Sequence, residues 1–186
     1  WPGRLEVVQD QPCVLLDGAH NPHAALALRK TLQELWPGRK LHVLVGISAD
    51  KSIGAMGNIL GPVASSVTCT ASRHPRACDP ERLAEQWKPY TKQVTVVPQA
   101  VDAYMYLLNT VDPTDLIVVT GSLFLVGELR PVVQQTRAQC RRDIRPQAPR
   151  AHPHPRVRRV ARAKPPDPRS DDDGGSAGSD TPRRSD

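Results

Sequence analysis

The sequence predicts an α/β fold in which helices cover both faces of a mostly parallel sheet. Three observations support this prediction. Strand-like and helix-like segments alternate along the first 140 residues, the connections between them are short, and several strand-like segments are continuous apolar runs. Alternation of this kind favours parallel strands joined by crossover helices. Continuous apolar runs are typical of strands that are covered on both faces.

The chain opens with two short strand-like segments, "RLEVVQ" at 4–9 and "CVLLD" at 13–17, separated by the turn-like "DQP". Because both are rich in Val and Leu, we expect them to pair as a hairpin at an edge of the sheet. A helix from about 22 to 36 follows, since its leucines recur at helical spacing and a proline-glycine pair comes after it.

Strands and helices then alternate to the end of the predicted domain. The predicted strands are at 41–47, 65–71, 93–98 and 115–121. The predicted helices are at about 52–60, 79–88 and 100–109, with a last one from 122 that is interrupted or ends near Pro131. Asp79 before a proline is a typical N-cap with proline at the first helical position.

We expect residues 1–140 to form this domain and 141–186 to form a disordered tail. The tail is rich in Arg, Pro, Gly, Ser and Asp, and its apolar content is too low to offset the loss of chain entropy on folding. A solvated tail is the plain interpretation. Binding to RNA or another anionic partner is an alternative, and a reading-frame artefact is a third.

The net charge of +6 resides mainly in this tail, since 141–186 hold 12 of the 25 Lys and Arg but seven of the 19 Asp and Glu. The remaining 13 basic and 12 acidic residues leave the predicted domain almost neutral. A broad nucleic-acid footprint on the fold is therefore not expected.

The cysteine pattern favours reduced thiols in a cytoplasmic protein, because none of the four cysteines has C-x-x-C spacing to another. No apolar run approaches the roughly 20 residues that a membrane span needs. We therefore expect no metal site, no disulfide framework and no membrane partner, and we expect a monomer. The chain begins at Trp1 rather than Met, so a fragment and a natural stand-alone domain both stay open.

Two strand-to-helix junctions carry the candidate functional residues: "DGAHNP" at 17–22 and "TGS" at 120–122. Ligands of open α/β sheets bind beyond the carboxyl ends of the strands, where helix N-termini offer free N–H groups. If both strands are parallel members of one sheet, both junctions lie at the same edge.

A purely structural interpretation of these junctions is also open. Asn21 before Pro22 is a good N-cap, and Ser122 could likewise be a plain cap. Gly18 could simply permit the turn, and Asp17 could hydrogen-bond to its own backbone.

Several motifs resemble, in order, the C-terminal domain of folylpolyglutamate synthase, including the bifunctional form that is also dihydrofolate synthase. "LLDGAHNPHA" is very similar to the signature of that domain, and "WPGRLEVV", "GISADKS", "PRA" and "VVTGSLFLVGELR" match further segments. The resemblance covers about 1–131. It implies a Rossmann-like fold of the Mur ligase C-terminal type, since the wider Mur ligase superfamily shares this fold.

The resemblance implies an ATP- and Mg²⁺-dependent ligation of L-glutamate to a folate or dihydropteroate carboxylate through an acyl phosphate. Arg4 and Asp17 match family residues that contact ATP, and His20 and Ser122 match positions near the incoming glutamate. We expect positioning roles for all four rather than nucleophilic catalysis, with His20 as the catalytic candidate.

The sequence departs from the family pattern in two places. Ser52 follows Asp50-Lys51 where many relatives have a further Asp, so Lys51 could be a solvated loop lysine. The sequence also contains no G-x-x-x-x-G-K-[ST] motif. In the family, that loop, the Mg²⁺ ligands and most of the folate site belong to a preceding N-terminal ATPase domain, so we expect the isolated chain to be inactive.

Two other hypotheses stay open. The chain could be a stand-alone binding module that keeps the fold without ligase activity, or part of another Mur-type amino-acid ligase. An upstream, in-frame P-loop domain would favour the ligase, and a start codon close to Trp1 would favour the module.

Overall fold

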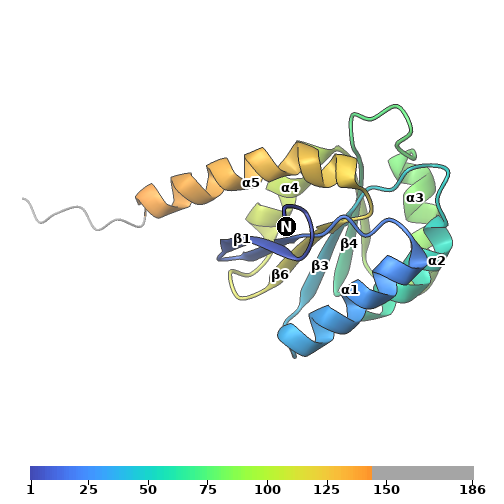
Figure 1. Cartoon of the computed structure of the whole chain (residues 1–186), viewed down its shortest axis with the longest axis horizontal. Coiled ribbons are helices and arrows are strands. Elements are labelled where there is room, and N and C mark those ends of the chain that lie inside the picture. The colour runs from blue at the N-terminus through green and yellow to red at the C-terminus, as the bar shows by residue number, and fades with distance from the viewer. Residues whose placement is uncertain (144–186) are drawn as a thin grey trace, which may run out of the picture. The chain divides into compact units, whose positions relative to one another are not determined.

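The computed structural model describes residues 1–143, with side chains to residue 137, and confirms the predicted α/β fold (Figure 1). The strands of this part are β1 (Glu6–Asp10), β2 (Cys13–Leu16), β3 (Leu41–Val45), β4 (Ser66–Ala71), β5 (Val94–Gln99) and β6 (Leu116–Thr120). The helices are α1 (Pro22–Leu35), α2 (Ile53–Leu60), α3 (Pro80–Trp87), α4 (Ala100–Thr110) and α5 (Leu123–Asp143). Short 3₁₀ turns follow α2 and α3, at Gly61–Val63 and Lys88–Tyr90.

One six-stranded sheet, in the order β1-β2-β6-β3-β4-β5, organises these elements. Every neighbouring pair from β2 to β5 is parallel, and β1 pairs antiparallel with β2 as the predicted edge hairpin. The last strand along the chain, β6, therefore lies between β2 and β3 at the centre of the sheet. This order brings two junctions that are far apart in the sequence next to one another.

Two separate hydrophobic cores lie on the two faces of the sheet. One contains the buried side chains of α1, α2 and α3, and the other contains those of α4 and α5. Strand β2 contributes to both: Cys13 and Leu15 belong to the first core, and Val14 and Leu16 to the second. This alternation follows from the two-residue period of a strand. It explains why β2 and β6, buried along their full length, are continuous apolar runs.

The predicted N-caps are confirmed where the structure describes them. The Asn21 side chain accepts a hydrogen bond from the N–H of Ala24 at 2.8 Å. Asp79 accepts from the N–H groups of Glu81 and Arg82, at 2.9 and 3.2 Å. In both cases proline follows at the first helical position, where its missing N–H costs nothing.

Helix α5 does not end near Pro131, as the sequence suggested, but continues to Asp143. The buried face extends across the proline, since Leu129 and Val133 are both fully buried in the second core. Proline removes one N–H donor from the helix, and this packing on both sides of Pro131 keeps the helix continuous. Consequently, the first three residues of the predicted tail, 141–143, are helical.

The rest of the predicted tail, 144–186, lies outside the described residues, so its character stays a prediction. No helix among residues 1–143 is long and apolar enough to cross a membrane.

A buried polar network ties three central strands together at the edge of the sheet where they begin. The His42 side chain of β3 contacts the Ser66 hydroxyl of β4 at 2.7 Å and the Asp115 carboxylate, just before β6, at 2.9 Å. Only 14% of the His42 side chain and 10% of the Asp115 side chain are exposed. Both ring nitrogens are therefore occupied, which indicates a structural histidine rather than a ligand.

We expect Asp115→Ala to destabilise the fold by about 1–3 kcal/mol, because it leaves a largely buried ring nitrogen of His42 without its partner. Urea unfolding followed by circular dichroism would measure the change. The exposed loop variant Asp50→Ala serves as control and should unfold close to wild type. Equal midpoints for Asp115→Ala and wild type would contradict this role of the network.

Candidate functional site

The two predicted junctions lie side by side at the carboxyl edge of the sheet. The Asp17 N–H donates to the Val119 carbonyl at 2.9 Å, and the Gly121 N–H donates to the Ala19 carbonyl at 2.9 Å. These bonds extend the parallel pairing of β2 and β6 into the loops that follow both strands. The prediction that both junctions share one edge is therefore confirmed.

Gly121 allows the second junction to pass very close to the end of β3. Its φ of +102° is in a region that favours glycine, and a Cβ there would lie 2.8 Å from the Gly46 carbonyl oxygen. The turn from β6 into α5 thus needs glycine for both backbone conformation and space, and it fixes the place of Ser122.

Ser122 caps α5, as the structural interpretation allowed. Its hydroxyl oxygen accepts a hydrogen bond from the Phe124 N–H at 3.1 Å, and 5% of the residue is exposed. A hydroxyl that accepts one bond keeps its own hydrogen to donate. Capping and ligand binding by Ser122 are therefore compatible.

His20 is held by a hydrogen bond that fixes its proton. Its Nδ1 atom lies 2.9 Å from the Gly18 carbonyl oxygen, which can only accept. Nδ1 therefore carries hydrogen, and in the neutral ring Nε2 is left with an acceptor lone pair. The sequence analysis did not distinguish these two nitrogens.

Both carboxylate oxygens of Asp17 accept backbone hydrogen bonds. Oδ1 accepts from the N–H of Ala19 at 2.9 Å, which is the local turn that the sequence allowed. Oδ2 accepts from the N–H of Leu5 at 3.0 Å, which ties the first junction to the segment before β1.

The segment before β1 is further held by Glu6 and Arg130. Glu6 accepts from the Gly3 N–H at 2.8 Å, and the Arg130 guanidinium donates to both of its carboxylate oxygens at 2.8–3.0 Å. The Gly3 carbonyl also accepts from the Gly18 N–H at 2.8 Å. The hydrogen bond from Arg130 lowers the pKa of Glu6 below 4.5.

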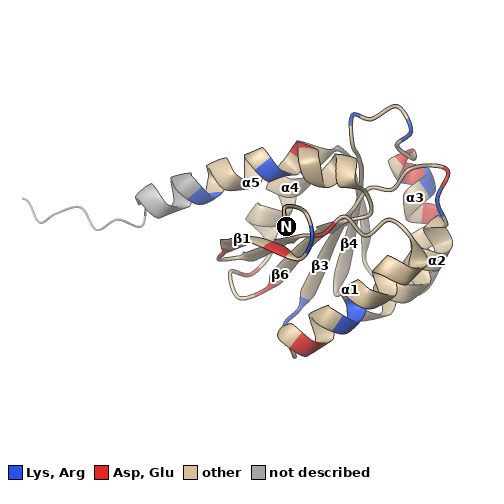
Figure 2. Ribbon diagram, viewed as in Figure 1, with Lys and Arg blue, Asp and Glu red and all other residues tan. Residues whose placement is uncertain are grey.

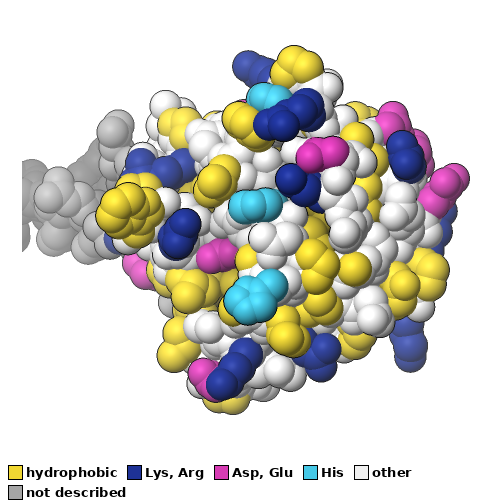
Figure 3. All heavy atoms as spheres, turned by 45° about the vertical axis from the view of Figure 1, so that its right-hand side comes forward, with side chains coloured by type: hydrophobic (Ala, Val, Ile, Leu, Met, Phe, Trp, Pro, Cys, Tyr) yellow, Lys and Arg dark blue, Asp and Glu magenta, His cyan; other side chains and the backbone are white. Residues whose placement is uncertain are grey.

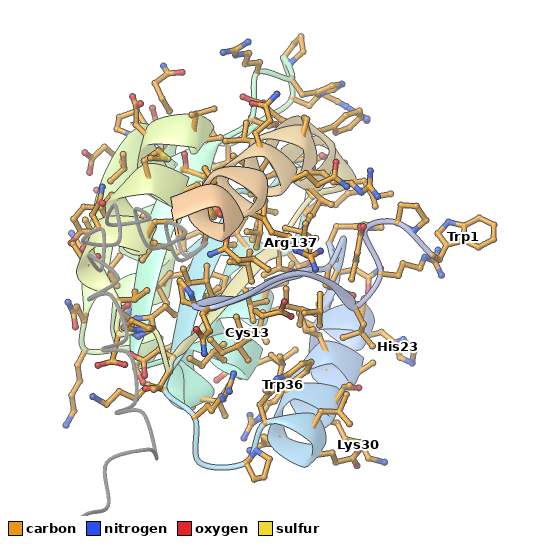
Figure 4. All side chains as sticks on the ribbon, turned by 90° about the vertical axis from the view of Figure 1, so that its left-hand side faces the viewer. Trp1, Cys13, His23, Lys30, Trp36 and Arg137 are labelled. Carbon is orange, nitrogen blue, oxygen red and sulfur yellow. The ribbon has the colours of Figure 1, made fainter. Side chains whose placement is uncertain are left out.

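A cleft of about 400 Å³ opens between the segment before β1, the first junction and α1. Arg4, Asp17 and His20 line it together, so the structure brings three of the four predicted site residues into one hollow. Ser122 does not line it, although the next residue, Leu123, does. Trp1, 95% exposed, points away from the body at the end of the same segment (Figure 4).

A second hollow of about 380 Å³ lies near the end of α1, beside Trp36 and Arg39. It is at the edge where the strands begin, as its contact with Leu41 and Leu116 shows. Because ligands of such sheets bind at the opposite edge, and Arg39 is its single charged residue, we favour the first cleft.

The loop after β4 forms a cluster with α5 that the sequence did not predict. The His74 ring stacks on Phe124 with 3.7 Å between centroids, and the Arg76 guanidinium lies 6.0 Å from the same ring. The neighbouring Arg73 reaches Glu128 of α5 at 3.5 Å. His74 therefore packs against the start of α5 through Phe124. Its partner lies 50 residues further along the chain, and no local signal could have identified it.

Lys51, in contrast, fits the solvated interpretation. Its ammonium pairs with the adjacent Asp50 at 3.1 Å, and 38% of its side chain is exposed. This pairing lowers the pKa of Asp50.

The charged surface of the described part is mixed. Basic and acidic residues are interspersed along the ribbon, in helices, loops and strand ends (Figure 2). On the face in Figure 3, histidines lie among hydrophobic groups and isolated charges of both signs. Among the side chains described, residues 1–137, no group of three His, Cys, Asp or Glu could hold a metal ion.

Comparisons with family models, curated proteins and solved structures all identify the same family. Residues 3–123 match the family described as Mur ligase, glutamate ligase domain. A probable bifunctional folylpolyglutamate synthase/dihydropteroate synthase of Haloferax volcanii is 39% identical over 131 residues, which are 70% of this chain and 15% of that protein. Folylpolyglutamate synthase of Lacticaseibacillus casei is 34% identical over 130 residues, which are 70% of this chain and 29% of that enzyme.

Solved structures show the same fold. Mycobacterium tuberculosis folylpolyglutamate synthase superimposes with a TM-score of 0.66 at 32% identity, covering 72% of this chain and 32% of that one. FolC of Escherichia coli superimposes with a TM-score of 0.67 at 26% identity, covering 74% and 32%. The chain therefore spans a third or less of the length of each of these proteins.

The lowered pKa of Glu6 predicts that the free energy of unfolding depends on pH. Ionised Glu6 contributes stability above pH 4.5, and this contribution is lost as the pH falls through the lower pKa of the folded state. Wild type should therefore exceed Glu6→Gln in free energy of unfolding near neutral pH, and the difference should shrink at about pH 3. Urea titrations at both pH values would measure it. Arg130→Gln should converge with wild type in the same way, and a pH-independent difference would contradict the pairing.

Proposed function

The chain belongs to the Mur ligase family, glutamate ligase domain, and from this premise we propose that it forms part of an ATP-dependent folylpolyglutamate synthase. In this proposal the enzyme joins L-glutamate to the carboxylate of a folate, and dihydropteroate is a second possible acceptor. The observation that carries the proposal is the meeting of Arg4, Asp17 and His20 in one cleft at the carboxyl edge of the sheet. The relatives named above support the choice of reaction.

The proposed reaction has two steps. The acceptor carboxylate takes the terminal phosphoryl group of ATP, which leaves ADP and an acyl phosphate. The amine nitrogen of glutamate then attacks the acyl carbon, the bond from that carbon to the phosphate oxygen breaks, and the amine loses a proton. The products are an amide and inorganic phosphate. Catalysis depends mainly on neutralising phosphoryl charge and on positioning the amine.

We assign the incoming glutamate to His20 and Ser122. The Nε2 lone pair of neutral His20 suits a hydrogen bond from the amino group of glutamate, because Nδ1 is already engaged. The Ser122 hydroxyl hydrogen suits a carboxylate oxygen, because its oxygen already accepts from Phe124. Together the two side chains could orient the amine toward the acyl carbon.

We assign the nucleotide to Arg4 and Asp17. Among the side chains that the structure describes, residues 1–137, none holds the Arg4 guanidinium by a hydrogen bond or ion pair; it lines the cleft and can donate in parallel to two phosphate oxygens. Asp17 can only accept, and its negative charge would repel a phosphate. A hydroxyl group of the nucleotide is the partner that fits its chemistry.

The remaining parts of the reaction need residues that this chain does not supply. Its sequence has no P-loop motif, and the described residues offer no cluster of three metal ligands. Other members of the fold are known with ADP and AMPPCP, with DHPP and ADP, and with AMPPNP and Mn. We propose that ATP and Mg²⁺ bind between this domain and an N-terminal ATPase domain, and that the ATPase domain supplies the metal ligands. The isolated chain should then be inactive.

Two alternatives are distinguished by experiment. A stand-alone binding module would keep the cleft without ligation, and another Mur-type ligase would use a different acceptor. The names of the relatives favour the folate branch over other Mur-type ligases.

The test is a ligation assay on the protein expressed with the coding sequence that precedes Trp1. The assay supplies ATP, Mg²⁺, radiolabelled glutamate and either tetrahydrofolate or dihydropteroate. We expect incorporation in wild type and a loss of about 100-fold or more in His20→Ala, since His20 positions the attacking amine. Asp17→Asn should impair ATP use.

His23→Ala is the matched control, because His23 is an exposed histidine three residues away on α1 (Figure 4). It should retain wild-type incorporation. A well-folded wild-type protein that incorporates no glutamate with either acceptor would reject the folate ligase.

A further inference from the structure

A pair of residues 124 positions apart connects the two ends of the domain. The Arg130 Nε donates to both carboxylate oxygens of Glu6 at 3.0 Å, and its Nη2 donates to Oε1 at 2.8 Å. Side chains of both residues are partly shielded, with 35% of Arg130 and 20% of Glu6 exposed. Such a two-point contact fixes orientation as well as distance.

Glu6 passes this restraint to the segment before β1. Its Oε2 also accepts from the Gly3 N–H at 2.8 Å. The same carboxylate therefore joins α5 to the backbone at Gly3, three residues before β1 begins. On the other side of Arg4, the Leu5 N–H is held by Asp17 at 3.0 Å. Arg4 thus lies between two residues whose backbone N–H groups are each bound by a carboxylate.

The backbone of this segment needs such restraint. Leu5 has a φ of +46°, a left-handed conformation that residues other than glycine rarely adopt. Gly3 has a φ of +71°. The hydrogen bond from the Leu5 N–H to Asp17 holds the backbone in this rarely adopted conformation. The bonds to Asp17 and Glu6, together with the bond from the Gly18 N–H to the Gly3 carbonyl, therefore orient the backbone on both sides of Arg4.

We propose that Glu6 and Arg130 are positioning residues that hold the segment Gly3–Leu5 so that the Arg4 guanidinium meets the nucleotide phosphates. This inference rests on the proposed function for the role of Arg4. In this proposal Arg130 contributes to nucleotide binding indirectly, since Arg130 itself does not line the cleft.

The same helix also begins at the proposed glutamate subsite. Ser122 caps α5, and Arg130 follows eight residues later, about 12 Å along the helix axis. One rigid element therefore holds both the capping serine and the clamp on the Arg4 segment.

The plain alternative is that Arg130–Glu6 only ties α5 to β1. The chain offers a matched control, because Arg137 of α5 also contacts β1, through Asp10 at 3.7 Å (Figure 4). The two pairs join the same two elements, but Glu6 alone also binds the backbone N–H of Gly3. A purely structural role predicts that both lysine variants lower the stability of the fold, each in proportion to the contact it loses, without changing nucleotide binding.

The experiment uses the protein expressed with the coding sequence that precedes Trp1. Three quantities are measured for wild type, Arg130→Lys, Arg137→Lys, Arg4→Ala and the double variant Arg4→Ala/Arg130→Lys. They are the Kd of the non-hydrolysable analogue AMPPNP, the KM for ATP and the KM for glutamate. Lysine keeps the charge of Arg130 but cannot reproduce the two-point contact. Glu6→Gln is the second variant, should Arg130→Lys fold poorly.

We expect Arg130→Lys to raise Kd for AMPPNP and KM for ATP about tenfold, with KM for glutamate unchanged. Arg137→Lys should change neither. In the Arg4→Ala background, Arg130→Lys should have no further effect, because the two residues act in series.

An effect of Arg130→Lys that persists in full in the Arg4→Ala background would overturn the inference, as would an equal effect of Arg137→Lys. If wild type binds AMPPNP but ligates no glutamate, the proposed function is rejected. The Kd values for AMPPNP of the single and double variants then still test whether Arg130 acts through Arg4. A wild type that ligates glutamate while Arg130→Lys leaves nucleotide binding unchanged would reject the inference alone. No binding of AMPPNP by wild type would reject both.

Discussion

The parallel pairing of β2 with β6 is the constraint on which the candidate site depends. It joins a strand near the start of the domain to the last strand of the sheet, and it continues past both strand ends through the bonds to Val119 and Ala19. The first junction thereby lies against the second, and the helix that follows each junction starts from the same edge. If β6 were at the outside of the sheet, His20 and Ser122 would belong to separate surfaces.

Much of the fold could be predicted from local sequence signals, because those signals have local causes. Continuous apolar runs indicated the buried central strands, and Asn-Pro and Asp-Pro pairs indicated two helix starts. Helix α5 was the exception. A proline usually interrupts a helix, but the burial of Leu129 and Val133 against the sheet outweighed this tendency, and a local pattern does not contain that contact.

The candidate site was predictable in its residue types and less so in its connections. The motif around Asp17 and His20 could be identified along the chain, and its place at the sheet edge followed from topology. The bond from Leu5 to Asp17 and the pair of Arg130 with Glu6 could not, because each joins segments that only the folded sheet brings together. The same reason applies to the stack of His74 on Phe124. Long-range side-chain contacts depend on the tertiary structure, which spacing along the chain does not describe.

The backbone hydrogen bonds of Asp17, His20 and Ser122 have a thermodynamic consequence. Each side chain is already fixed by a bond to the main chain before any substrate arrives. Little rotational freedom is then left to lose when a ligand binds, so the entropic cost of ordering these groups falls on folding rather than on association. The candidate site on this domain is consequently preorganised, because its side chains need not turn far to meet a ligand.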